Sequence, residues 1–301
     1  MQRLFVVYNP RSSKFRHVRD EVLARLPDCK GYLIGKYDIK KTNFDDNVNT
    51  IAKLLKDGDI IIAVGGDATA AMCVNAAILS GKDVALSALP YGNFNDFART
   101  LGTKTLDDIL SSQKITNYYP LELITDGKSR RYAACYITIG MTAAATEIFD
   151  KSKLRTKIKN SKLHSVRSYL SLAGWYFKNR YKKPYLSEHT INGVKESPKT
   201  SDYFAVNGRS AAGIMKGGEE YKSSKSFTSF SGKLTSFWRL AIFMAKSILV
   251  KTPGQTTTGD TIVFDGSTSV SVQAEGEIIP VDDCTTIEIK KSPRPLKVIQ
   301  N

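Results

Sequence analysis

Two apolar segments that each end abruptly in a glycine-containing loop constrain the fold of this chain. In Ile60–Thr69 a run of β-branched residues stops at Gly65 and Gly66, and in Leu86–Arg99 a similar run leads into Gly92. A short, continuously apolar run predicts a parallel strand covered on both faces, with the following loop at the carboxyl end of the sheet. Open α/β sheets bind ligands at that edge. The sequence therefore predicts an α/β fold with a ligand site at these two loops.

The loop after the first of these strands has the composition of a phosphate-binding turn. Gly65 and Gly66 lack the Cβ atoms that would keep an anion away from backbone N–H donors, and a helix expected from Thr69 to about Leu79 adds the positive end of its dipole. Taken alone, this loop is equally well interpreted as an ordinary strand-to-helix turn. The second loop favours the functional interpretation, because it gathers glycine, asparagine, aspartate, phenylalanine and arginine within a few residues.

Strands and helices alternate in the first 125 residues. Strands are expected at residues 4–8, 31–35, 60–64 and 84–89, and helices at about residues 15–26, 47–56, 69–79 and 106–110. This alternation predicts parallel βαβ units. Beyond a linker near residues 125–128, the sequence pattern changes to short runs typical of β-strands, separated by turns. These runs lie at residues 131–139, 203–206, 261–264, 269–273 and 286–289. We therefore expect a second domain that is rich in β-sheet.

Composition narrows the classes of partner and compartment. Lys and Arg outnumber Asp and Glu by 44 to 29, and the net charge of +15 favours anionic partners such as a nucleotide, a nucleic acid or an acidic membrane surface. The four cysteines are widely separated and form no CxxC pair, which predicts a reducing, cytoplasmic compartment. The amino-terminal apolar stretch is too short for a signal peptide, and no window is apolar enough to predict a membrane-spanning helix.

Four motifs occur in a fixed order: Asn9-Pro10-Arg11-Ser12-Ser13, Gly65-Gly66-Asp67-Ala68-Thr69, Pro90-Tyr91-Gly92-Asn93-Phe94-Asn95-Asp96-Phe97-Ala98-Arg99 and Glu275-Gly276-Glu277. This series resembles the lipid kinases of the diacylglycerol kinase catalytic-domain superfamily, which includes soluble bacterial diacylglycerol kinases and sphingosine kinases. The resemblance implies a Rossmann-like nucleotide-binding domain over residues 1–125 and about 286–301, and a β-sandwich lipid-binding domain over residues 126–285. The active site is expected in the interdomain cleft, with ATP and its Mg²⁺ as cofactors.

The resemblance also implies roles for individual residues. The expected catalytic residues are Glu277, Asp67 and Glu275. Glu277 is expected to accept a proton and Asp67 to position water, metal or the acceptor, while Glu275 replaces the aspartate of the family motif. The residues expected to hold the nucleotide are Asn9, Ser12, Ser13, Thr42, Gly65, Gly66, Asp67, Ala68, Thr69, Gly92, Asn93, Asn95, Asp96 and Arg99. Without the glycine loops, an acidic β-turn around Gly276 would be the better interpretation of the last motif.

Several positions depart from the family pattern. Ser13 and Ala68 replace glycines, and we expect Ala68 to strain the loop by roughly 1 kcal/mol if its position requires a positive φ. Ser231 occupies the place of an aspartate that many bacterial members use in a structural magnesium site, so no metal-binding residue is assigned. Asn75 either lies close to the phosphate loop, as in the family, or caps internal backbone.

A basic and aromatic segment, Lys151–Lys183, contains eleven Lys or Arg residues and no acidic residue, a composition typical of an anionic membrane surface. A solvated helix is the alternative, and no recognised nucleic-acid-binding module is present. The run from Phe237 is expected to form a helix that packs in the core or lines an acyl-chain slot. Oligomeric state is open, with a homodimer as one alternative.

The sequence thus predicts an ATP-dependent kinase that phosphorylates a hydroxyl group of a diacylglycerol-like or sphingoid lipid, cytoplasmic and peripherally associated with a membrane. Two alternatives stay open. One is a degenerate, non-catalytic member of the same fold that binds nucleotide and membrane, and the other is a small-molecule kinase similar to NAD kinase.

Overall fold

The computed structural model describes residues 1–151, 188–196 and 202–301, apart from residues 13, 113, 214 and 235, and it also describes residues 174, 178 and 186. Two predictions lie outside the described residues. These are the role of Ser13 in the first loop and, apart from three of its residues, the membrane-binding segment Lys151–Lys183. Both stay predictions.

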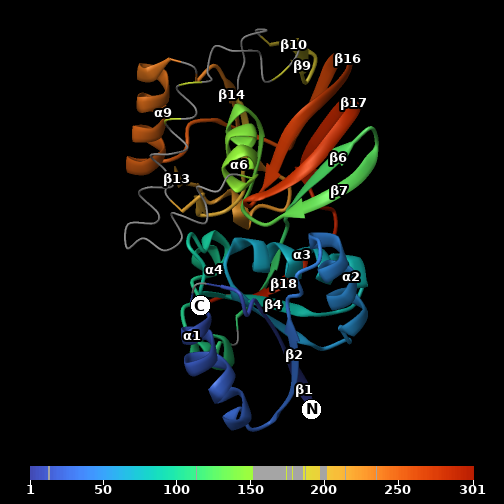
Figure 1. Cartoon of the computed structure of the whole chain (residues 1–301), viewed down its shortest axis with the longest axis vertical. Helices are drawn as coiled ribbons and strands as arrows, with labels where there is room; N and C mark the ends of the chain where they lie inside the picture. Colours follow the sequence, from blue (N-terminus) through green and yellow to red (C-terminus); the bar gives the residue numbers. More distant parts are fainter. Residues whose placement is uncertain are drawn as a thin grey trace.

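Six strands form a mostly parallel sheet in the order β2-β1-β3-β4-β18-β5 (Figure 1). Their bounds are β1 (Gln2–Tyr8), β2 (Tyr32–Asp38), β3 (Ile60–Gly65), β4 (Ala85–Pro90), β5 (Ile115–Tyr118) and β18 (Leu296–Ile299). Neighbouring strands run parallel except β5, which is antiparallel to β18. Because β3 and β4 are adjacent and in register from Ile60 to Gly65, the loops that follow them leave the same edge of the sheet.

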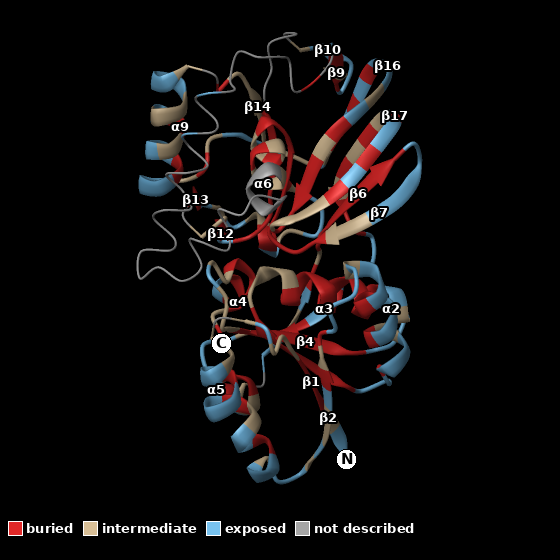
Figure 2. Ribbon diagram, viewed as in Figure 1, coloured by how far each residue is buried: buried red, intermediate tan, exposed pale blue. Residues whose placement is uncertain are grey.

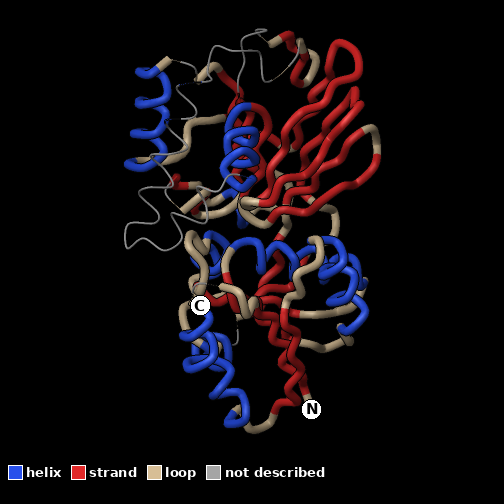
Figure 3. The backbone as a smooth tube through the Cα atoms, in the orientation of Figure 1, coloured by secondary structure: helices blue, strands red, loops and turns tan. Residues whose placement is uncertain are grey.

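Helices cover both faces of this sheet, as a Rossmann-like arrangement requires. One face packs against α2 (Phe44–Leu54) and α3 (Asp67–Ser80). The other packs against α5 (Leu106–Ser111) and a helical segment formed by α1 (Phe15–His17), a π-helical turn (Val18–Val22) and a 3₁₀ helix (Leu23–Asp28). The short helix α4 (Asp96–Leu101) follows β4. Figure 3 shows these helices on either side of the strands.

A second, antiparallel sheet of ten strands confirms the β-rich second part of the predicted fold class. Its strands are β6 (Leu121–Thr125), β7 (Lys128–Ala133), β8 (Tyr136–Gly140), β9 (His189–Ile191), β10 (Val194–Lys195), β11 (Asp202–Val206), β14 (Phe227–Gly232), β15 (Gln255–Thr257), β16 (Gly259–Ala274) and β17 (Glu277–Lys291). They enclose an apolar cluster of their own. The runs expected at residues 261–264 and 269–273 belong to one strand, β16, because irregularities between Val263 and Val270 bend the strand without ending its pairing with β17.

Smaller elements complete the second part of the chain. They are the hairpin of β12 (Ser210–Ala211) and β13 (Met215–Lys216), a 3₁₀ turn (Glu220–Lys222), and the helices α6 (Met141–Lys151) and α9 (Phe237–Leu249). Among the described helices, none combines the length and the apolar character that crossing a bilayer requires.

The chain passes between the two sheets twice, after β5 and after β17. The two crossings are tied together, because the Ser292 N–H donates to the Pro120 carbonyl at 2.8 Å and the buried Lys291 ammonium donates to the Tyr119 carbonyl at 3.2 Å. Because β6 lies in the second sheet and β18 in the first, the chain passes from one sheet to the other a few residues away from the expected domain limits at 125 and 286. The domain limits therefore stay a proposal.

The helix α3 is the contact layer between the two parts of the molecule. Every residue from Thr69 to Ile78 is buried, and one apolar cluster joins α3 to residues of the second part such as Tyr136 and Phe204 (Figure 2). Asn75 fastens this layer, since its Nδ2 donates to the Tyr132 carbonyl at 2.8 Å and its Oδ1 accepts from the Tyr132 N–H at 2.9 Å. Of the two interpretations of Asn75, the structure supports the capping of internal backbone.

We expect Asn75→Ala to lower the free energy of unfolding by on the order of 2 kcal/mol, because it leaves the partly buried N–H and carbonyl of Tyr132 without these partners. Urea denaturation of the whole chain measures the change. The matched control is Asn93→Ala, at an exposed asparagine, which should change stability by less than about 0.5 kcal/mol. Equal effects of the two substitutions would contradict this role.

Candidate active site

The two glycine loops touch each other through their backbones. The Tyr91 N–H donates to the Gly65 carbonyl at 3.1 Å, and a Cβ placed on Gly92 would lie 2.1 Å from the Gly66 Cα. No side chain fits that distance, so glycine at position 92 is required by close approach and not by a positive φ. The two loops therefore form one continuous backbone surface at the carboxyl edge of β3 and β4.

Asp67 and Asn95 hold this surface in shape. Asn95 adopts a left-handed conformation with φ 58°, which turns its backbone N–H toward Asp67 Oδ2 at 2.9 Å. The next N–H, that of Asp96, donates to Asp67 Oδ1 at 2.6 Å. The Asn95 side chain closes its own loop by accepting from the Gly92 N–H at 2.7 Å. One carboxylate thus binds the start of α3 to the start of α4.

The first predicted loop lies beside the second glycine loop. The Ser12 hydroxyl donates to the Tyr91 carbonyl at 3.3 Å, and Asn9 shapes the turn by accepting from the Arg11 N–H at 3.0 Å. The Arg11 guanidinium donates to the Lys40 carbonyl at 2.9 Å, which brings the loop after β2 alongside.

Thr42, in that loop after β2, is exposed. Its hydroxyl accepts from the buried amide of Asn47 at 3.0 Å. Asn93 is also exposed, at the tip of the second glycine loop. The two side chains lie on loops that follow β2 and β4, and these strands are separated in the sheet by β1 and β3.

The expected strain at Ala68 is wrong. Ala68 is not among the residues with positive φ, because it is the second residue of α3 and has the negative φ of a helix. Its Cβ therefore costs no backbone energy. Thr69 is buried, and a Cβ on Gly65 would meet its hydroxyl oxygen at 2.4 Å, so Gly65 is required by the packing of Thr69.

The late acidic motif forms the two-residue turn between β16 and β17. Glu275 and Gly276 both have positive φ, 52° and 87°, as a hairpin turn of this length demands. Glu275 points inward and is only 3% exposed. Its Oε1 accepts from the Cys135 N–H at 2.6 Å, whereas its Oε2 is buried and has no hydrogen-bond partner among the described residues.

Glu275, Asp67 and Asp96 form a cluster of interacting carboxyl groups. Burial raises the pKa of Glu275 to about 8, and the negative charge of Asp67 adds to the effect. Burial likewise raises the pKa of Asp67 to about 7, with the charge of Asp96 as the second cause. A group with a pKa near neutrality can accept or release a proton under physiological conditions. The structure therefore brings the turn after β16 to the glycine loops.

Glu277, on the other side of the turn, lies near a different charge. Burial lowers the pKa of Arg131, and the carboxylates of Asp45 and Glu277 act against this effect. Arg131 pairs with Asp45 at 3.1 Å and lies over the Phe44 ring, 3.9 Å from its centroid. The two glutamates of the motif therefore have different surroundings. Glu275 faces the carboxyl cluster, and Glu277 lies near the positive charge of Arg131 on β7.

Asp96 and Arg99, which the resemblance places at the nucleotide, both contact the second part of the molecule. Asp96 is buried and accepts from the Ser210 hydroxyl and from the Gly213 N–H at 3.1 Å. Arg99 donates to the Gly213 carbonyl at 3.1 Å and to the Phe94 carbonyl. Sequence reasoning missed Arg131, Cys135 and Ser210, because none of them stands in a recognisable motif.

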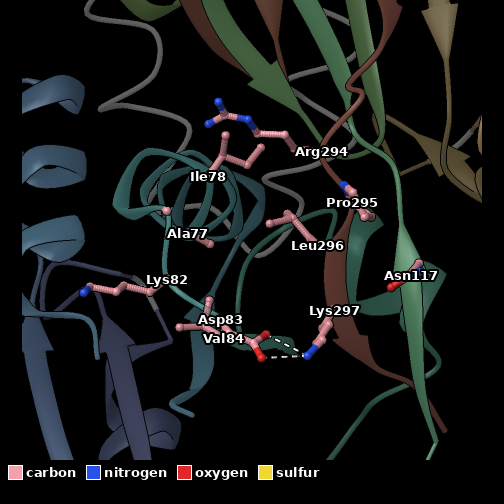
Figure 4. A pocket seen from close by; sticks show the side chains of 11 residues that line it. Ala77, Ile78, Lys82, Asp83, Val84, Asn117, Arg294, Pro295, Leu296 and Lys297 are labelled. Carbon is pink, nitrogen blue, oxygen red and sulfur yellow. Dashed lines mark hydrogen bonds and ion pairs between the residues drawn. The ribbon is translucent and has the colours of Figure 1, made fainter. Parts of the chain in front are cut away.

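Two cavities lie away from this cluster. One, of about 310 Å³, is lined by residues 81–84 and 294–297 at the far end of α3, about 20 Å from Asp67, with Lys297 and Asp83 paired at 2.7 Å (Figure 4). The other, of about 300 Å³, lies in the second sheet and includes Ser231 and the buried Asp260. Among the described residues, no three His, Cys, Asp or Glu side chains converge to hold a metal ion.

We expect the stability of the protein to fall as the pH rises from about 5 to 8. The raised pKa of Glu275 means that the folded state keeps a proton which the unfolded state, with a pKa near 4.5, has released. Glu275→Gln removes this contribution and should flatten the pH dependence by up to about 1.4 kcal/mol per pH unit. Urea denaturation at pH 5, 6, 7 and 8 measures it.

In the Glu275→Gln protein, the free energy of unfolding should still fall with rising pH, but less steeply, because the pKa of Asp67 is also raised. The control is Asp282→Asn, which removes an exposed carboxylate from the same hairpin and should leave the wild-type slope. A Glu275→Gln protein with an undiminished slope would show that Glu275 is ionised in the folded state.

Comparison with known proteins finds similarity over the first part of the chain. Residues 3–136 match the family model of the diacylglycerol kinase catalytic domain. A diacylglycerol kinase of Staphylococcus carnosus (strain TM300) is 28% identical over 160 residues, which cover 52% of this chain and 50% of that protein. A diacylglycerol kinase of Staphylococcus saprophyticus subsp. saprophyticus is 31% identical over 113 residues, 37% of this chain and 36% of that protein. The chain thus spans half or less of the length of these curated relatives.

The fold extends further than the sequence similarity. The crystal structure of a diacylglycerol kinase from Bacillus anthracis str. Sterne superposes with a TM-score of 0.66 over 100% of this chain and 97% of that chain, at 16% identity. This likeness shows a shared two-part fold. The turn Glu275–Glu277 lies outside the residues that the family model matches. Its inclusion in the candidate active site therefore rests on the resemblance of its sequence to the family motif and on the position of Glu275 beside Asp67. Over residues 3–136, the chain matches the diacylglycerol kinase catalytic domain, the family that its motifs resemble.

Proposed function

We propose that this chain is an ATP-dependent lipid kinase that transfers the γ-phosphoryl group of ATP to a hydroxyl group of a diacylglycerol-like or sphingoid lipid at a membrane surface. One observation carries the proposal. The loops at Gly65–Thr69 and Gly92–Arg99 and the acidic turn at Glu275, which lie far apart in the sequence, meet in one place. Phosphoryl transfer requires groups that bind the phosphates and carboxylates side by side, and backbone N–H groups beside carboxylates support this proposal.

The backbone of the glycine loops is suited to the phosphates. Gly66 immediately precedes α3, so the first N–H groups of this fourteen-residue helix and its positive dipole end lie at the surface made by Gly66 and Gly92. We propose that these groups bind the phosphates of ATP, with Asn9, Ser12 and Thr42 toward the remainder of the nucleotide. Asn93 completes the loop, and Asp96 and Arg99 hold it in position.

The carboxyl cluster creates a demand for positive charge. Ionised Asp67, Asp96 and Glu275 would repel the phosphates, and a cation or a proton must offset that repulsion. Mg²⁺ binds through one or two carboxylates together with substrate phosphates, so Asp67 fits the ion that accompanies ATP. Such an ion neutralises charge on the phosphates during transfer. No residue is proposed for a separate structural metal site.

The acceptor hydroxyl must lose its proton during transfer. We propose Glu277 as the proton acceptor, in keeping with the resemblance, with Asp67 positioning the acceptor. Glu275, buried and turned toward Asp67, sets the charge of the cluster. The protein is proposed to act from the cytoplasmic side as a peripheral membrane protein.

Gly92→Ala should abolish binding of ATP. The added methyl group would lie 2.1 Å from the Gly66 Cα, so the two loops must separate and the phosphate-binding surface is lost. Isothermal titration calorimetry with MgATP measures the binding constant. The matched control is Gly259→Ala, at a glycine without positive φ whose Cβ would meet its neighbours at an ordinary 3.6 Å. Unchanged ATP affinity in Gly92→Ala would refute this assignment of the phosphate site.

Asp67→Asn and Glu277→Gln should each lower the rate of lipid phosphorylation by at least about a hundredfold, the scale of a lost proton acceptor or charge-positioning group. The assay combines the purified protein with radiolabelled ATP, Mg²⁺ and a mixed lipid extract, and follows label in the organic phase. Asp282→Asn, remote from the cluster on the same strand as Glu277, should retain wild-type activity.

The same assay decides between the alternatives. Label confined to a water-soluble product would favour a small-molecule kinase. ATP and vesicle binding without transfer of label would favour a degenerate member of the fold.

A further inference from the structure

The helix α9 presents apolar side chains on the face that points away from the protein. Its inner side packs through Phe243, whose ring lies 4.7 Å from that of Phe230 and 5.4 Å from that of Phe204. On the opposite side, Trp238 is 72% exposed, Ile242 54% and Leu249 72%. These three residues are spaced i, i+4 and i+11, so they form one stripe along the helix. The expectation that this segment packs in the core is met by its inner side only.

A surface helix normally directs polar side chains toward water. The residues of α9 include no Asp or Glu, and its two cations, Arg239 and Lys246, are exposed and seven positions apart, at one margin of the apolar stripe. A helix with an apolar outer face, a cationic margin and an exposed tryptophan is typical of the interface between a bilayer and water.

We propose that the outer face of α9, formed by Trp238, Ile242 and Leu249, docks on an anionic lipid bilayer with the helix lying in the plane of the membrane. The proposal rests on the proposed lipid kinase function and names the surface that such an enzyme would use. The cations of α9 and the net charge of +15 favour an anionic membrane over a protein partner, because lipid headgroups match both the charge and the apolar stripe.

The position of α9 in the fold supports this surface. The helix lies at the outer margin of the second part of the molecule, and its outer face is exposed (Figures 1 and 2). Its last turn is held to β13, because the Lys216 ammonium donates to the Leu249 carbonyl at 3.2 Å. The hairpin of β12 and β13 in turn contacts Asp96 through Ser210 and Gly213. A single hairpin therefore connects the proposed membrane surface to the carboxyl cluster.

Vesicle flotation tests the proposal. The full chain is mixed with vesicles of phosphatidylglycerol and phosphatidylcholine, or of phosphatidylcholine alone, and we expect binding that requires the anionic lipid. The double variant Trp238→Ser/Ile242→Ser should bind at least about tenfold more weakly, since two large apolar side chains no longer leave water on docking. The matched control is Leu79→Ser, at a leucine 58% exposed on α3, which should bind like the wild type.

A spectroscopic measurement reports on the same contact. In a Trp175→Phe background, Trp238 is the single tryptophan, and its fluorescence should shift to shorter wavelength on addition of the anionic vesicles. An unshifted spectrum, or undiminished flotation of the double variant, would overturn the proposal. So would light scattering that finds the wild type dimeric and the double variant monomeric, because α9 would then be a protein interface.

The outcome is separable from that of the proposed function. Phosphorylation of dissolved, short-chain dioctanoylglycerol in the absence of vesicles depends on the active site alone, and the α9 double variant should retain it. Loss of that activity in every protein, together with α9-dependent flotation, would refute the kinase and leave the docking surface standing. Full activity, together with equal flotation of the wild type and the α9 double variant, would refute the docking surface and leave the kinase standing.

Discussion

The contact between Gly66 and Gly92 is the constraint on which the candidate site depends. The two backbones approach so closely that any side chain at position 92 would collide with the Gly66 Cα. This contact fixes the end of β3 against the end of β4, and Asp67 then binds the N–H groups of Asn95 and Asp96. The amino end of α3 is therefore held in a single position. In the proposed function, such a rigid surface needs no reorganisation when a phosphate binds.

The same loops also join the two parts of the protein. Asp96 belongs to α4 of the first part, but its carboxyl group accepts hydrogen bonds from Ser210 and Gly213 of the second. The buried helix α3 shares its apolar cluster with both sheets, and Asn75 bonds to the backbone of Tyr132. Any movement between the two parts would therefore disturb the glycine loops.

The carboxyl cluster connects this geometry to chemistry. Burial, and after it the negative charge of the neighbouring carboxylates, raises the pKa values of Asp67 and Glu275. The ionised cluster is therefore unfavourable unless protons or a cation compensate its charge. Binding of a nucleotide with its Mg²⁺ would replace the protons. The site thus favours a ligand that brings its own positive charge. In the proposed arrangement, the docked α9 would bring the lipid to the same region through the hairpin of β12 and β13.

The sequence by itself determined the parallel βαβ order, the two glycine-containing loops and the resemblance to diacylglycerol kinases, because apolar runs ending in glycine and a ten-residue motif are local patterns. It also located the helix at Phe237, but not which of its faces meets water. Only the tertiary structure decided that Ala68 is unstrained within α3, that Glu275 and not Glu277 faces Asp67, and that Asp96 binds Ser210 across the two parts. Each of these depends on packing between segments distant in the chain, and no local pattern in the sequence encodes such packing.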